Sequence, residues 1–220
     1  METVSLRNIR LFELTDQTDG RVCYGLDQEW YRSEWQRRAG CGPTTVATIL
    51  SYLGRSRGIP GLGGALTRAD GLALMEKTWR FVTPTDDGIP SAGLLCRGVR
   101  SCARALRLPL TAEPLDIPGT RGGSGRPPFP RLLSFLRSAL EEDSPPAFLN
   151  LHSGEEERLA PWHWVTVAAL SDEEDGSSAF LDLLDEGEIK RIDLAKWFRT
   201  TRLGGGFVRF HLSGRTGLDL

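Results

Sequence analysis

The chain has 220 residues, a formal net charge of −2, 40% hydrophobic residues and 25% charged residues, which are ordinary values for a globular protein. Its length suits one domain, and its small net charge gives no electrostatic case for binding nucleic acid or an anionic membrane surface. No stretch approaches the roughly 18 apolar residues that cross a bilayer, and residues 1–14 lack the pattern of a secretory signal. We therefore expect a cytoplasmic protein that binds neither nucleic acid nor membranes.

The first 40 residues carry few signals of regular structure. Residues 1–20 are expected to be weakly structured, with Ile9, Leu11 and Leu14 available to a sheet edge. Residues 21–40 form an aromatic-rich lead-in to the first clear helix.

Predicted helices dominate the chain from there to about residue 142. Apolar residues at intervals of three and four predict helices over about 41–53, 67–81, 91–106 and 129–140. The second is marked by Thr67 with Asp70 three residues later, the pattern of a helix cap. Glycine and proline predict loops at 54–64, 83–90 and 116–130.

Predicted strands follow after residue 146. Five apolar stretches read as strands, and they span 147–151, 162–170, 179–184, 188–192 and 206–212. A short helix is expected over 193–200. Helices first and strands afterwards predict an α+β fold with one antiparallel sheet. We expect a single domain over 1–220, with a helical part at about 41–142 and a sheet part at about 145–212.

The four cysteines do not have the spacing of a metal site. They are Cys23, Cys41, Cys96 and Cys102, and they form no Cys-x-x-Cys pair and no Cys/His arrangement that suits zinc. A reducing cytoplasm keeps such thiols free. Cys96 and Cys102 lie within or beside the apolar face of a predicted helix, which favours core packing for both. We expect no metal and no organic cofactor.

Cys41 is the candidate nucleophile, because it stands between two glycines immediately before an apolar-periodic segment. Pro43 fits the first helical turn, where its missing N–H costs nothing. Cys41 therefore falls at a helix N-terminus, where free N–H groups and the positive dipole end favour an anion. A thiol so placed is acidified and becomes nucleophilic. The alternative is a buried structural cysteine beside a tight turn.

A catalytic cysteine needs a base, and His163 is the best candidate among the three histidines. It lies in a predicted strand between Trp162 and Trp164, whose rings could exclude water. His152 follows a strand and falls in a predicted loop, and His211 lies near the end of a predicted edge strand. A structural role for a strand histidine is the alternative interpretation.

The base in turn needs an orienting group, and the tetrahedral intermediate needs hydrogen-bond donors. Asp185 ends a predicted strand at a turn, where it could orient the imidazole, although Asp-x-Gly is also common turn chemistry. Asp182, in the middle of the same strand, stays open because the register is not fixed. A glutamine before Cys41 could join its backbone N–H in stabilising the oxyanion. Gln36 lies five residues upstream and Gln28 thirteen, so spacing alone favours Gln36.

Four stretches together carry a resemblance to a known family. They are Tyr24-Gly25-Leu26-Asp27-Gln28-Glu29-Trp30, Gly40-Cys41-Gly42-Pro43, Trp162-His163-Trp164-Val165-Thr166-Val167 and Asp185-Glu186-Gly187. In type and order they resemble the papain-like cysteine peptidases, specifically the branch that includes the double-glycine leader peptidases of bacteriocin exporters and their stand-alone bacterial relatives. The middle of the chain, about 55–142, matches nothing beyond helices.

The resemblance implies a papain-like fold and a role for each residue. Cys41 would be the nucleophile, His163 the general base, Asp185 the orienting group and Gln28 the oxyanion donor. Gln28 is preferred here because the aromatic motif around it matches the stand-alone relatives. The expected activity is cleavage of a peptide or related amide through an acyl-enzyme. A catalytically silent binding protein and an acyltransferase using the same cysteine and histidine are the alternatives.

Overall fold

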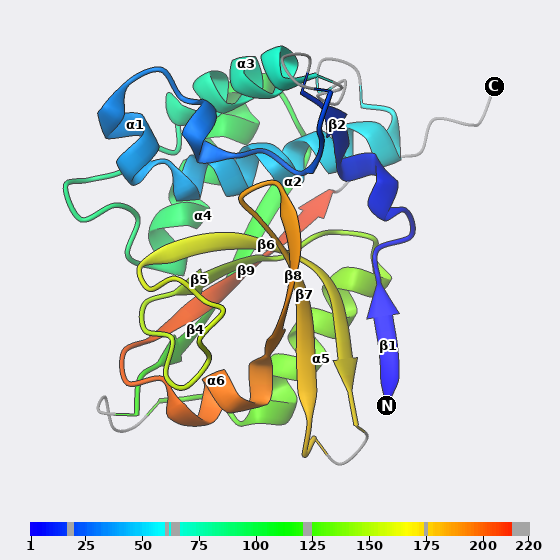
Figure 1. The fold of residues 1–220 in the computed structure, drawn as a ribbon, viewed down its shortest axis with the longest axis vertical. Coiled ribbons are helices and arrows are strands. Elements are labelled where there is room, and N and C mark those ends of the chain that lie inside the picture. Colours follow the sequence, from blue (N-terminus) through cyan, green and yellow to red (C-terminus); the bar gives the residue numbers. More distant parts are fainter. Residues whose placement is uncertain (17–19, 60–61, 63–66, 121–124, 174–175, 213–220) are drawn as a thin grey trace.

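A twisted antiparallel sheet forms the lower layer of the computed structural model, and helices cover one end of it (Figure 1). The structure describes residues 1–16, 20–59, 62, 67–120, 125–173 and 176–212. Within these residues the sheet has seven strands in the order β4-β9-β5-β6-β7-β8, with β1 also paired to β6. Its strands are β1 (Glu2–Ser5), β4 (Leu110–Pro118), β5 (Ala147–Asn150), β6 (His163–Asp172), β7 (Ala179–Asp185), β8 (Glu188–Asp193) and β9 (Gly204–Leu212).

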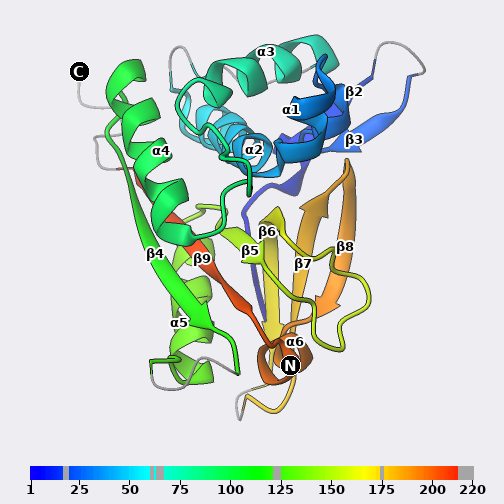
Figure 2. The same ribbon diagram turned by 90° about the vertical axis from the view of Figure 1, so that its left-hand side faces the viewer.

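The helices lie on two sides of this sheet. They are α1 (Glu34–Ala39), α2 (Cys41–Arg57), α3 (Arg68–Trp79), α4 (Ala92–Leu106), α5 (Phe129–Glu141) and α6 (Leu194–Thr200). Figure 2 shows α1, α2 and α3 above the sheet, whereas α4 runs beside β4 and α5 lies against the sheet below. The 3-10 turns η1 (Ile9–Phe12) and η2 (Gln28–Trp30) and the pair β2 (Glu13–Thr15) and β3 (Val22–Tyr24) complete the fold. The expected α+β architecture with one large antiparallel sheet is confirmed.

The central helix is α2, whose residues 42–54 are all buried. It packs between α3 on one side and β5 and β6 on the other, which explains why apolar residues occupy more than one stripe. The helix continues to Arg57, so the expected end at residue 53 is wrong. Position 54, inside the helix, is a glycine because a Cβ there would collide with the carbonyl of Leu62. The chain leaves the helix at Gly58, which has a left-handed φ of 61°.

β6 is the central strand, and it changes neighbours along its length. Its first half pairs with β5 through His163 to Thr166, and its second half pairs with β1 through Ala169 to Asp172. β7 lies along its other side, with a bulge between Val167 and Ala169. His163 is therefore the first residue of a strand that is hydrogen-bonded to three others, β1, β5 and β7.

The N-terminal residues are more ordered than expected. Residues 2–5 form β1 in the large sheet, and Phe12 is buried and stacks on Tyr52 with ring centroids 4.7 Å apart. Ile9 and Leu11 lie in η1 rather than at a sheet edge, and Leu14 pairs only within the small β2–β3 sheet. The structure was missed because these elements are too short to show a period.

The stretch 116–130 is only partly the expected loop. Residues 116–118 end β4, which the sequence did not predict, and 121–124 lie outside the described residues. β4 carries prolines at 114 and 118 and pairs with β9 alone, and proline is tolerated in such edge strands. Thr120 then donates its N–H to the Thr201 carbonyl at 3.3 Å, beside the end of α6.

The other predicted helices and strands agree with the structure to within a few residues. In the predicted loop at 54–64, residues 54–57 belong to α2, and 60–61 and 63–64 lie outside the described residues. The cap of α3 is a reciprocal capping box between Thr67 and Asp70, as expected. Among the described residues, no helix is long and apolar enough to cross a membrane.

Candidate active site

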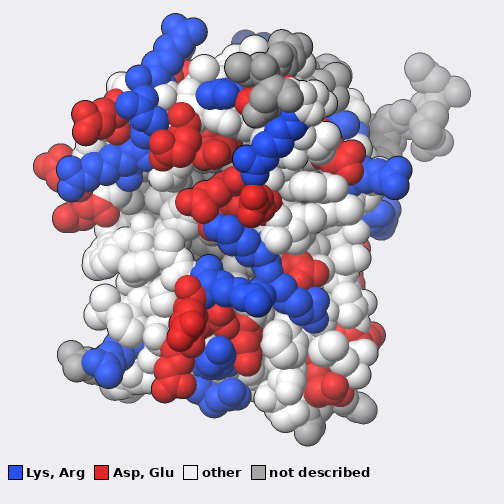
Figure 3. Space-filling view, in the orientation of Figure 1, with Lys and Arg blue, Asp and Glu red and all other residues white. Residues whose placement is uncertain are grey.

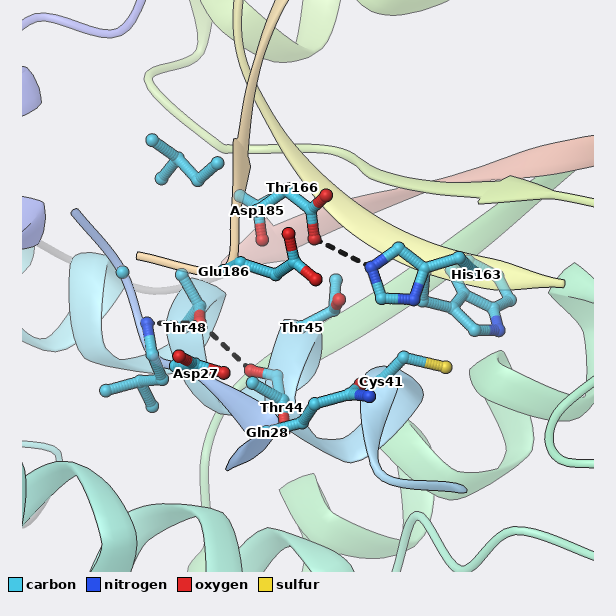
Figure 4. A pocket seen from close by; sticks show the side chains of 14 residues that line it. Asp27, Gln28, Cys41, Thr44, Thr45, Thr48, His163, Thr166, Asp185 and Glu186 are labelled. Atoms are coloured by element: carbon cyan, nitrogen blue, oxygen red, sulfur yellow. Dashed lines mark hydrogen bonds and ion pairs between the residues drawn. The ribbon is translucent and has the colours of Figure 1, made fainter. Parts of the chain in front are cut away.

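The first turn of α2 and the start of β6 place Cys41 below the ring of His163 (Figure 4). Gly40 joins α1 to α2 with almost no space around it. A Cβ at Gly40 would collide with the Gln36 carbonyl and crowd the ring of Tyr31. Glycine before the cysteine is thus required by the packing of two consecutive helices, and it fixes where Cys41 enters the site.

His163 forms a short hydrogen bond with Asp185, which ends the neighbouring strand β7. Its Nε2 lies 2.7 Å from Oδ1 of Asp185, and the two side chains are only 15% and 10% exposed. Because Nε2 faces Asp185, the other ring nitrogen, Nδ1, is turned toward Cys41 (Figure 4). The structure therefore brings together Cys41, His163 and Asp185, three residues that are distant in sequence.

The charges of this group support one another. Burial favours a neutral imidazole, but hydrogen bonds and charge interactions with Asp185 and Cys41 outweigh it and raise the pKa of His163 to about 10. Burial likewise opposes ionisation of Asp185, yet the imidazolium of His163 and the ammonium of Lys190 lower the pKa of this carboxyl group below its ordinary value. At neutral pH the pair is therefore an imidazolium next to a carboxylate.

Lys190 is a positioning residue that the sequence did not indicate. Its Nζ lies 2.8 Å from Oδ2 of Asp185 and 2.6 Å from Oε2 of Glu186. The hairpin between β7 and β8 turns on Glu186 and Gly187, whose φ values of 53° and 76° are those of a two-residue type I′ turn. This tight turn fixes the register, and the register places Lys190 diagonally across from Asp185 on the same face of the hairpin.

Of the two candidate glutamines, Gln28 lines the pocket with Cys41. Its Nε2 donates to the Arg37 carbonyl at 2.9 Å, which holds the amide in place. Gln36 lies on α1 and uses its side chain elsewhere, since its Nε2 donates to Glu76 at 2.9 Å. The geometry thus favours the glutamine that spacing alone did not.

The other candidate residues lie outside the site. Asp182 pairs with Arg191 at 3.1 Å and, being three positions before Asp185 on one strand, points to the opposite face. His152 accepts the N–H of Gly154 through Nδ1, so it supports a loop. His211 lies on β9, which is an inner strand between β4 and β5 and not the expected edge strand, and its side chain contacts Glu113 and Glu142.

A polar pocket extends from Cys41 and His163 toward η2. Asp27 caps η2 by accepting the N–H of Glu29 at 2.9 Å, and this cap positions the following Gln28. Burial, together with the nearby carboxylates of Glu186 and Asp185, raises the pKa of Asp27 despite that bond. Four threonines also line the pocket, Thr44, Thr45, Thr48 and Thr166 (Figure 4). Among the described residues, no group of three or more His, Cys, Asp or Glu side chains could hold a metal ion.

The sequence matches no protein-family model and no curated protein. The functional argument therefore depends on the geometry of this site and on the motifs that led to it.

Proposed function

We propose that the protein is a papain-like cysteine peptidase, a thiol hydrolase that cleaves a peptide or related amide bond through an acyl-enzyme on Cys41. The observation that carries the proposal is the partly buried 2.7 Å hydrogen bond between His163 and Asp185, with the imidazole directed at a cysteine on the first turn of a helix. A cysteine at a helix N-terminus next to an imidazolium is the environment of an activated thiolate.

The proposed reaction uses each residue in a separate role. The Cys41 thiolate attacks the substrate carbonyl, while its proton resides on His163. The imidazolium then protonates the departing amine as the C–N bond breaks and the thioester remains. Neutral His163 next takes a proton from water, whose oxygen attacks the thioester; the C–S bond breaks, the acid leaves, and the Cys41 thiolate and the imidazolium are restored. Asp185 holds the imidazole throughout.

Gln28 and the backbone N–H of Cys41 are the proposed oxyanion donors. An amide nitrogen carries two hydrogens, and the Arg37 carbonyl accepts only one of those on Gln28. That contact fixes the plane of the amide without using up its capacity to donate. A preorganised donor of this kind is worth more than a mobile one, because little reorganisation is needed when charge develops.

The first test is the pH dependence of alkylation by iodoacetamide, with the modified cysteine located by mass spectrometry. We expect modification confined to Cys41 well below pH 8, and loss of that reactivity in His163→Ala. Cys96 and Cys102 are internal controls, because burial raises the pKa of each to about 11. Slow modification of several cysteines would contradict the proposal and favour a silent binding protein.

The second test is turnover of a library of fluorogenic amides, with Cys41→Ala as the control. Activity in Cys41→Ala comparable to wild type would overturn the mechanism. Added amine nucleophiles separate hydrolysis from acyl transfer, since a transferase would give the new amide as the main product.

A further inference from the structure

A second hollow opens on the other side of Cys41, away from the polar pocket that Asp27 and Glu186 line. Its volume is about 850 Å³, which includes open solvent, and most of the residues that line it are apolar, although polar atoms make up nearly half of its surface. Figure 4 shows the Cys41 sulfur pointing away from Asp27 and Glu186. Trp164 is part of this lining, is only 2% exposed, and donates its indole N–H to the Ile89 carbonyl at 2.8 Å. That bond ties the turn before α4 to β6, so two walls of the hollow are held together.

Two exposed tryptophans line the same hollow. Trp35 comes from α1 and is 42% exposed, and Trp162 precedes β6 and is 56% exposed. Indole rings that are exposed to water beside a concave surface are typical of binding sites, because they offer a large, rigid contact area. Figure 3 shows mainly uncharged surface over the start of β6, in contrast to the mixed charges over β7 and β8.

Trp162 has an unfavourable backbone conformation. Its φ of 56° lies in the left-handed region, where a bulky side chain is strained and glycine is not. The ring is too exposed for its burial in the core to offset the free-energy cost of this strain. Backbone strain that core packing does not explain is found preferentially at functional sites. Trp162 immediately precedes His163 in the sequence.

We propose that Trp35 and Trp162 form a subsite for a large apolar side chain of the substrate, preferentially aromatic, next to the bond that Cys41 attacks. This inference depends on the proposed peptidase function for its name, but its physical content is a binding site. The occupant is part of the substrate because Cys41 itself lines the hollow. The charged residues along the hollow are Arg38, Asp86 and Asp87, so both signs are present and the two exposed indole rings decide the preference.

Binding is tested without turnover on Cys41→Ala protein. The probes are N-acetyl amides of phenylalanine, leucine, arginine and glycine, and the readout is the NMR signals of the indole N–H groups, assigned through Trp35→Phe and Trp162→Phe. We expect the phenylalanine amide to shift both signals and to bind at least tenfold more tightly than the glycine amide. Equal binding of the two, or tighter binding of the arginine amide, would overturn the proposal.

A glycine substitution separates function from folding. Trp162→Gly relieves the backbone strain, so the melting temperature should stay the same or rise, while the preference for phenylalanine over glycine falls at least tenfold. The control is Arg107→Gly, which relieves a similar φ of 54° at the end of α4, outside the hollow. It should leave binding unchanged. If Trp162→Gly keeps the preference for the phenylalanine amide over the glycine amide, the proposed subsite is refuted. Alkylation of Cys41 tests the peptidase proposal separately, so either idea can fail alone.

Discussion

Replacing Asp185 by asparagine tests how the charge on His163 is maintained. Asparagine keeps the size and a hydrogen-bond acceptor but removes the negative charge 2.7 Å from Nε2. An opposite charge at this distance shifts a pKa by about 1–3 units. We therefore expect the pKa of His163 to fall from about 10 by that amount in Asp185→Asn.

The same change has a calculable effect on stability. Because folding raises the pKa of His163 from 6.5 to about 10, protonation stabilises the fold fully below pH 6.5, and the contribution is lost as pH rises through about 10. At 1.36 kcal/mol per unit, this contribution is about 4 kcal/mol at pH 7. A pKa lowered by 1–3 units removes about 1–4 kcal/mol of it. The difference between wild type and variant should narrow as pH approaches 10.

The assay is an NMR titration of the imidazole signals, combined with urea unfolding at pH 7 and pH 10. The chain has three histidines, so substituting His152 and His211 in turn assigns the signal of His163. Asp182→Asn is the matched control, because Asp182 pairs with Arg191 on the opposite face of the strand. A wild-type pKa near 6.5, or equal effects of the two substitutions, would refute the reasoning.

Substitutions at three further residues probe the support of the site and the fold. Lys190→Met removes the ammonium that holds the orienting carboxylate, so alkylation of Cys41 at pH 7 should slow several-fold, with partial recovery in Lys190→Arg; an unchanged rate would exclude a positioning role. Gly54→Ala should destabilise by about 1–3 kcal/mol in urea unfolding, because its Cβ would collide with the backbone of Leu62. Gly93→Ala, with open space around it, should instead stabilise α4 by up to about 1 kcal/mol.

Local signals in the sequence predicted the elements that are bounded by caps and strong periodicity. Thr67 and Ser91 cap α3 and α4 within a residue of the expected starts. β4 was not predicted because Pro114 and Pro118 are residues typical of loops. The segment is a strand because it pairs with β9 along its whole length. α1 escaped because six residues are too few to show a helical period.

The sequence predicted those site residues whose type and position at the end of a helix or strand indicate a functional role. Cys41 and Asp185 stand at the end of an element, where a side chain reaches a site without breaking the ladder. The choice between Gln28 and Gln36 depended on α1, which turns Gln36 toward Glu76. Lys190 was missed because its place depends on the register of one hairpin, which distance in sequence does not fix.

The pairing of β1 with β6 has a consequence for synthesis of the chain. Glu2 pairs with Asp172 and Ser5 with Ala169, so the first strand of the sheet to leave the ribosome pairs with a strand that is made much later. At about 5–20 residues per second, it waits roughly 10–30 s for its partner. During that time the backbone of residues 2–5 lacks its native partner. A bulky group fused before Met1 would therefore have to travel with this strand to the far end of β6.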